Sequence, residues 1–74
     1  MIMKTNYIVS AIPKKPGIKE RQYTEVYDIG HYYARNAGKQ NHEVLRLLIY
    51  NGDKPPERQD INLMDYDVMI HLNK

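Results

Sequence analysis

The segment spanning residues 22–40 constrains the fold more than any other part of the chain, because it carries the clearest helix signals. Asp28 is a residue type that caps helix N-termini, and Gly38 is the type that follows helix C-termini. These signals predict a helix over residues 29–37. A longer helix capped by Thr24 is the alternative, but the β-branched and aromatic residues before Asp28 favour a strand there.

Other segments show the composition or the alternation of β-strands. Residues 4–12 and 19–27 are rich in β-favouring side chains, and the sequence PKKPG between them suits a tight turn. Residues 43–50, EVLRLLIY, form the most apolar stretch and predict a strand at the centre of a sheet. Residues 66–72 show the cleanest alternation, as in a half-buried strand. Residues 57–61, which follow two prolines, fit a single helical turn.

Together these elements predict one small α+β domain over residues 1–74, in the order ββαββ. The expected sheet has four antiparallel strands in the order 2-1-3-4, with the helix packed on one face. A chain of 74 residues buries only about 60% of the surface that its unfolded form exposes, so the core should be thin. The chain has no cysteine, which excludes disulfides and thiolate metal ligands.

One helix covers one face of such a sheet, so the opposite face is the expected binding surface. The alternation places an apolar and aromatic set of side chains there, and patches of this kind commonly mark interaction sites. The predicted partner-binding residues are Tyr23, Tyr27, Arg46, Tyr50, Met69 and His71. The expected occupant is a protein, either a target or a second copy that forms a homodimer. The alternatives are that the loop over residues 51–64 covers this face, or that the alternation is reversed in one strand.

A basic cluster supports a second hypothesis, in which the chain binds nucleic acid. The candidate contacts to nucleic acid or to an acidic partner are Lys14, Lys15, Lys19, Arg21 and Arg35. They would neutralise phosphates while Tyr23 and Tyr27 stack on unpaired bases. The net charge is only +2, and the second half of the chain is acidic, so protein binding ranks above this alternative.

The sequence does not predict an enzyme, a cofactor or a metal site. Its single serine, Ser10, has no neighbouring acid or histidine, and no cysteine is available as a nucleophile. The three histidines lack a metal-ligand spacing, and the four glycines do not form a phosphate-binding loop. No apolar stretch approaches the ~20 residues of a membrane span, so we expect a cytoplasmic protein without membrane association.

The order of the elements resembles that of a known group of inhibitors. The expected elements are the strands KTNYIVSAI and QYTEVY, the helix DIGHYYARNAGKQ and the third strand EVLRLLIYNG. In this order, residues 3–52 resemble small phage anti-CRISPR proteins, the type I-F inhibitors of ββαββ build. The resemblance implies a stoichiometric inhibitor that binds a CRISPR complex, or another host nucleoprotein complex, in the bacterial cytoplasm. The proline-containing loop and the last strand depart from the pattern, and the resemblance assigns no individual residue.

Overall fold

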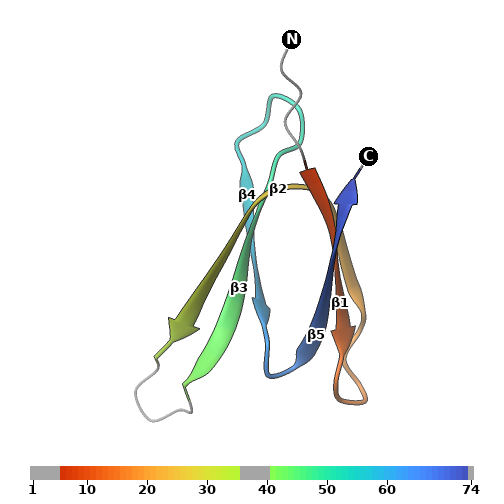
Figure 1. The fold of residues 1–74 in the computed structure, drawn as a ribbon, viewed down its shortest axis with the longest axis vertical. Helices are drawn as coiled ribbons and strands as arrows, with labels where there is room; N and C mark the ends of the chain where they lie inside the picture. Colours follow the sequence, from red (N-terminus) through yellow and green to blue (C-terminus); the bar gives the residue numbers. More distant parts are fainter. Residues whose placement is uncertain (1–5, 36–40, 74) are drawn as a thin grey trace.

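The computed structural model describes residues 6–35 and 41–73, and their regular structure is entirely antiparallel β-sheet. The five strands are β1 (Asn6–Pro13), β2 (Arg21–Ala34), β3 (His42–Ile49), β4 (Glu57–Asn62) and β5 (Tyr66–Asn73). They form one sheet in the order β4-β3-β2-β1-β5 (Figure 1). The expected α+β class, with four strands in the order 2-1-3-4 and a covering helix, is therefore wrong. Residues 57–61 belong to a strand and not to a helical turn.

The second half of β2 occupies the segment for which the sequence predicts the start of a helix. It pairs with β3 from Asp28, opposite Leu48, to Ala34, opposite His42. Pairing with the most apolar strand of the protein outweighs the local capping signals, because strand formation depends on packing against neighbours. Gly38, the expected end of the helix, lies outside the described residues. The described part of the chain contains no helix that could cross a membrane.

β2 bends sharply near its middle, and this bend folds the sheet over on itself. The register of β2 shifts against β1 between Tyr23 and Val26, and against β3 between Val26 and Asp28. Glu25 lies at the first shift with a φ of 55°, a left-handed conformation of the kind found in bulges. Its carbonyl accepts a hydrogen bond from the backbone N–H of Tyr50 at 3.2 Å. β2 consequently arches from the side of β1 and β5 to the side of β3 and β4 (Figure 1).

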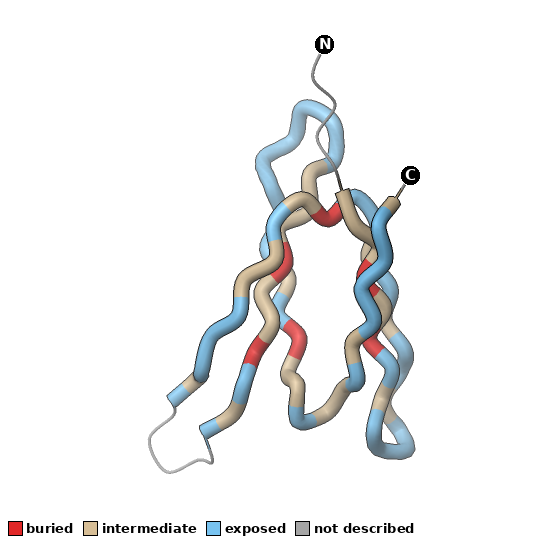
Figure 2. Tube along the Cα trace, in the orientation of Figure 1, coloured by how far each residue is buried: buried red, intermediate tan, exposed pale blue. Residues whose placement is uncertain are grey.

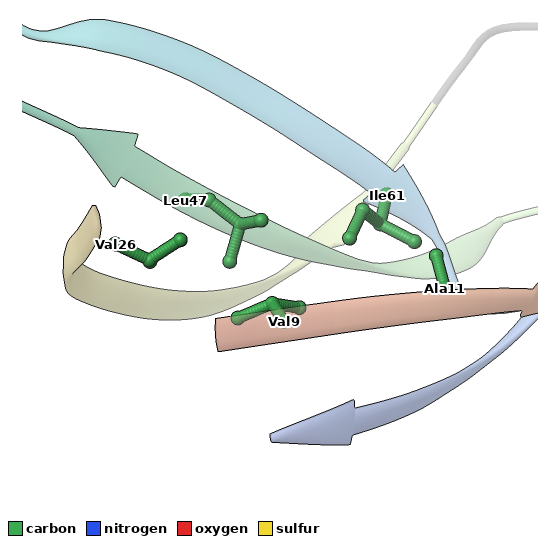
Figure 3. Packing of buried hydrophobic residues seen from close by; sticks show 5 residues of the cluster. All are labelled: Val9, Ala11, Val26, Leu47 and Ile61. Carbon is green, nitrogen blue, oxygen red and sulfur yellow. The ribbon is translucent and has the colours of Figure 1, made fainter. Parts of the chain in front are cut away.

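The folded sheet encloses its own core, so one half of the sheet covers the other in place of the expected helix. We call β5, β1 and the start of β2 the first limb, and the end of β2, β3 and β4 the second limb. The buried positions lie on both limbs (Figure 2). Five fully buried side chains meet between the limbs (Figure 3), those of Val9, Ala11, Val26, Leu47 and Ile61. We call the face that carries them the inner face and the opposite one the outer face.

Arg21, at the start of β2, connects the two limbs across the inner face. Its Nη2 donates a hydrogen bond to Oε1 of Gln59 on β4 at 3.2 Å, and its Nη1 donates to the carbonyl oxygen of Asp60 at 3.4 Å. Its Cζ lies 5.1 Å from the ring centroid of Tyr23 and 5.7 Å from that of Tyr66. A guanidinium at these distances is attracted to the aromatic faces. Arg21 therefore joins side chains of β2, β4 and β5.

Substituting Arg21→Met is expected to lower the free energy of unfolding by about 1–2 kcal/mol, because it removes the hydrogen bonds and the cation–π contacts while keeping an apolar stem. Urea denaturation measures the change. Lys19→Met is the matched control, since Lys19 is exposed, and its effect should stay within about 0.5 kcal/mol. Equal effects of the two substitutions would show that Arg21 does not stabilise the contact between the limbs.

Candidate protein-binding edge

The sheet has two free edges, β4 and β5, since no other strand of residues 6–35 and 41–73 pairs with their outer sides. A free edge presents backbone N–H and C=O groups that can pair with another strand. The two edges differ in their side chains: β4 reads ERQDIN and is mainly charged and polar, whereas β5 reads YDVMIHLN and is mainly apolar. Charged side chains protect an edge against strand addition, so β5 is the candidate binding edge.

On β4, charged side chains form a cross-strand cluster on the outer face. The Nε of Arg58 donates to Oδ1 of Asp60 at 3.1 Å, and the hydroxyl of Tyr32 on β2 donates to Oδ2 of Asp60 at 3.2 Å. The Cζ of Arg58 lies 5.8 Å from the ring centroid of Tyr32. The hydrogen bond to Asp60, and secondly the interaction with Tyr32, raise the pKa of Arg58 above its ordinary value. An added strand at β4 would therefore have to lie beside the paired side chains of Arg58 and Asp60.

On β5, apolar side chains are exposed on both faces. Ile70 and Leu72 lie on the inner face, because they are opposite Val9 and Tyr7 of β1, yet they are 47% and 52% exposed. Met69, on the outer face, is 47% exposed. The C-terminal part of β5 thus combines apolar surface with backbone groups that no described strand pairs.

Two of the six residues predicted to bind a protein partner lie on this edge, and a third is placed differently from the prediction. Met69 and His71 point to the outer face of β5, opposite Ser10 and Ile8 of β1. Tyr23 instead lies on the inner face and packs against the core cluster. Its expected outward position is wrong, because the bulge of β2 adds a residue and reverses the side chains that precede it.

Tyr27 and Tyr50 contact each other at the bend of β2. Their ring centroids are 5.3 Å apart and the rings are nearly perpendicular, at 83°. The hydroxyl of Tyr27 accepts a hydrogen bond from Nδ2 of Asn6 at 3.3 Å. Edge-to-face pairs of this geometry contribute to stability, so the two tyrosines help to hold the bend.

Arg46, the sixth of these residues, lies on the outer face of the second limb, opposite Gly30 of β2. Its Nη2 donates to Oδ2 of Asp28 at 3.2 Å. A Cβ added to Gly30 would lie 2.6 Å from this Nη2, so the guanidinium rests directly above the glycine. Arg46 is held by its neighbours on β2 and does not join Met69 and His71 in one surface.

The hairpin lysines predicted as nucleic-acid contacts face carboxylates of the same chain. Lys14 Nζ lies 3.7 Å from Oδ1 of Asp67, and Lys15 Nζ lies 3.4 Å from Oδ1 of Asp65. Exposed ion pairs of this kind are weak, but the acids reduce the positive potential that phosphates would meet.

The other predicted basic contacts are dispersed. Arg21 lies on the inner face, in contact with Gln59. Lys19 is exposed in the loop between β1 and β2, and Arg35 is exposed after the end of β2. The structure therefore does not bring Lys14, Lys15, Lys19, Arg21 and Arg35 together into one continuous basic surface.

Two exposed inner-face residues of β5, Ile70 and Leu72, are not among the predicted site residues. Ile12, which is 38% exposed on the neighbouring β1, is not among them either. The alternation of residues 66–72 indicated a strand, but alternation alone does not show that a strand lies at an edge. That position follows from the pairing of β5 with β1 alone.

No group of three or more metal-ligating side chains occurs in the described ranges 6–35 and 41–73. A shallow hollow of about 340 Å³ lies beside the turn between β4 and β5. Its lining comprises Tyr33, Asn41, His42, Glu43, Leu63 and Met64. The hollow is broad and open, unlike the largely enclosed sites that bury small ligands.

A scan against protein-family models and searches of curated proteins and of solved structures gave no significant match to this chain.

Proposed function

We propose that the protein is a non-enzymatic binding module that acts by stoichiometric association with another protein. The partner contributes an extended segment that pairs with the free side of β5. The observation that carries this proposal is the contrast between the two edges: β4 is protected by the Arg58–Asp60 pair, whereas β5 exposes Met69, Ile70 and Leu72.

Addition of a strand at β5 is physically favourable for two reasons. The backbone of the partner satisfies the hydrogen-bonding groups of the edge, which gives affinity without a specific sequence. Alternate side chains of the partner then cover Ile70 and Leu72 on the inner face and Met69 on the outer face, which gives selectivity for apolar residues at those positions.

In this proposal the module is an inhibitor from a phage or another mobile element that blocks a host nucleoprotein complex in the bacterial cytoplasm. The order of segments that resembles anti-CRISPR proteins suggested this class of target. The helix included in that resemblance is part of β2, so the support for protein binding comes from β5 and not from the resemblance. Nucleic-acid binding, the alternative function, has no specific support. Lys14 is paired with Asp67, and Lys15 is paired with Asp65.

A titration with a generic β-forming peptide tests the proposed mode of binding. The probe is the nine-residue peptide KVTVKVTVK, added to isotope-labelled protein while backbone amide resonances are recorded. We expect the largest shifts at the amides of β5 and small shifts at those of β4. Ile70→Lys should weaken binding about tenfold, because a charge at the edge opposes strand addition.

Glu57→Lys is the matched control, since it places the same side chain on the exposed end of β4. It should leave the affinity of the peptide for β5 unchanged. Shifts concentrated on β4, or no shifts at millimolar peptide, would contradict the proposal.

A further inference from the structure

We infer that the partner of the β5 edge is a second copy of this chain, and that two β5 strands pair antiparallel about a twofold axis at Met69. The inference rests on the proposed function, because it names a second copy as the occupant of the same edge in the free protein, and a target segment that pairs with β5 then replaces that copy. It follows from the order of side chains along β5, which is complementary to itself in one antiparallel register.

In that register, Met69 lies opposite Met69 of the other copy, and residues equally distant from it on either side face each other. Asp67 of each copy is then directly opposite His71 of the other, on the outer face. Both side chains are exposed, and 72% of the side-chain surface of Asp67 is accessible to solvent. An imidazole can donate to a carboxylate in either of its protonation states, so two polar pairs flank the axis.

The inner face is complementary in the same register. Val68 lies opposite Ile70 of the other copy, and Tyr66 lies opposite Leu72. Cross-strand pairs of aromatic and aliphatic side chains stabilise antiparallel sheets. The pairing thereby covers Ile70 and Leu72, two inner-face side chains that the fold leaves about half exposed.

Neighbouring registers lack this complementarity. Directly opposite residues must share a face, so the axis can move only by whole residues along the strand. An axis at Val68 places Asp67 opposite Met69, and an axis at Ile70 places Asp67 opposite Asn73. Only the axis at Met69 pairs the acid of β5 with its histidine.

The result would be a closed dimer. A twofold contact uses the same surface on both copies and leaves no second β5 edge for further addition. The outer edges of the joined sheet are then the two β4 strands, whose charged Arg58 and Asp60 oppose continued growth.

The decisive test uses single cysteines, since the chain has none of its own. Met69→Cys should give a disulfide-linked dimer under mild oxidation, because directly opposite Cβ atoms lie about 4.5–5.5 Å apart. His71→Cys, two residues away on the same face, is the matched control. In this register the two copies of position 71 are offset by four residues, or roughly 13 Å, so crosslinking should be at least tenfold slower.

Light scattering over a concentration series measures the noncovalent dimer. His71→Glu should raise the dissociation constant of the dimer about tenfold, because Asp67 of each copy then faces a second carboxylate. Combining Asp67→Lys with His71→Glu should restore the original dissociation constant. Equal crosslinking of the two cysteine variants, or failure of the double variant to restore the dimer, would overturn the inference. A monomer at all concentrations whose β5 amides still respond to KVTVKVTVK would also overturn it, while leaving the proposed function standing.

Discussion

Leu47→Ala is expected to lower the free energy of unfolding by about 2–5 kcal/mol. Leu47 is fully buried at the centre of the core cluster, where β3 meets both β2 and β4. The substitution removes apolar contacts and leaves a cavity that the two limbs can close only in part. A domain of 74 residues has roughly 4–11 kcal/mol of stability in total, so this is a large fraction of it. Urea denaturation, fitted as a two-state transition, gives the value.

Leu48→Ala is the control, since Leu48 is the next residue of β3 but lies on the outer face and is only half-buried. Leu48→Ala should lower the free energy of unfolding by less than half as much as Leu47→Ala does. Similar losses at the two positions would mean that the inner face is not the dominant core of the protein.

Glu25→Val is expected to lower the free energy of unfolding by about 1–3 kcal/mol, because a β-branched residue tolerates a φ of 55° poorly. Glu25→Gly should act in the opposite direction and raise stability by less than about 1 kcal/mol. Glycine adopts positive φ without strain, but it also increases the entropy of the unfolded chain. Thermal and urea denaturation should agree on the order of the three proteins.

Thr24→Val controls for the introduction of valine at an exposed position of the same strand. Thr24 is not in the left-handed region, and valine favours strands, so little change is expected. If Glu25→Val proved as stable as Thr24→Val, the backbone at residue 25 would not hold the bend of β2.

The sequence predicted the strands whose composition or alternation is typical of β-structure. β1, β3 and β5 lie within two residues of their expected ranges, and each contributes to the core, through Val9, Leu47 and Val68 respectively. These assignments succeeded because β1 is rich in β-favouring residues, β3 is the most apolar stretch of the chain, and β5 alternates between its two faces.

β2 was misassigned because its bend changes that period. The bulges direct Tyr23, Val26 and Ile29 all toward the inner face, at intervals of three residues instead of two. Apolar residues three apart also occur on one side of a helix, so the pattern before Gly30 does not distinguish a bent strand from a helix. The pairing with β3 decides between them, and this pairing is a long-range property.

The candidate site was predicted only in part, because its location depends on which strands lie at the edges. β4 gave little signal, since Ile61 is its one buried apolar residue and the preceding prolines suggested a turn. Without β4, the contrast between a charged and an apolar edge could not be recognised. Met69 and His71 were identified from the alternation of β5, while their neighbours Ile70 and Leu72 were not among the predicted site residues.

The pairing of β1 with β5 determines when this protein can fold during its synthesis. β1 pairs along its whole length, from Asn6 opposite Asn73 to Pro13 opposite Tyr66, so its partner is the last of the five described strands in chain order. Contacts between such distant residues form slowly, because a long loop must close before they contribute. On the ribosome, one side of β1 therefore remains unpaired until β5 has been synthesised, and the strand that we propose to be the binding edge completes the sheet.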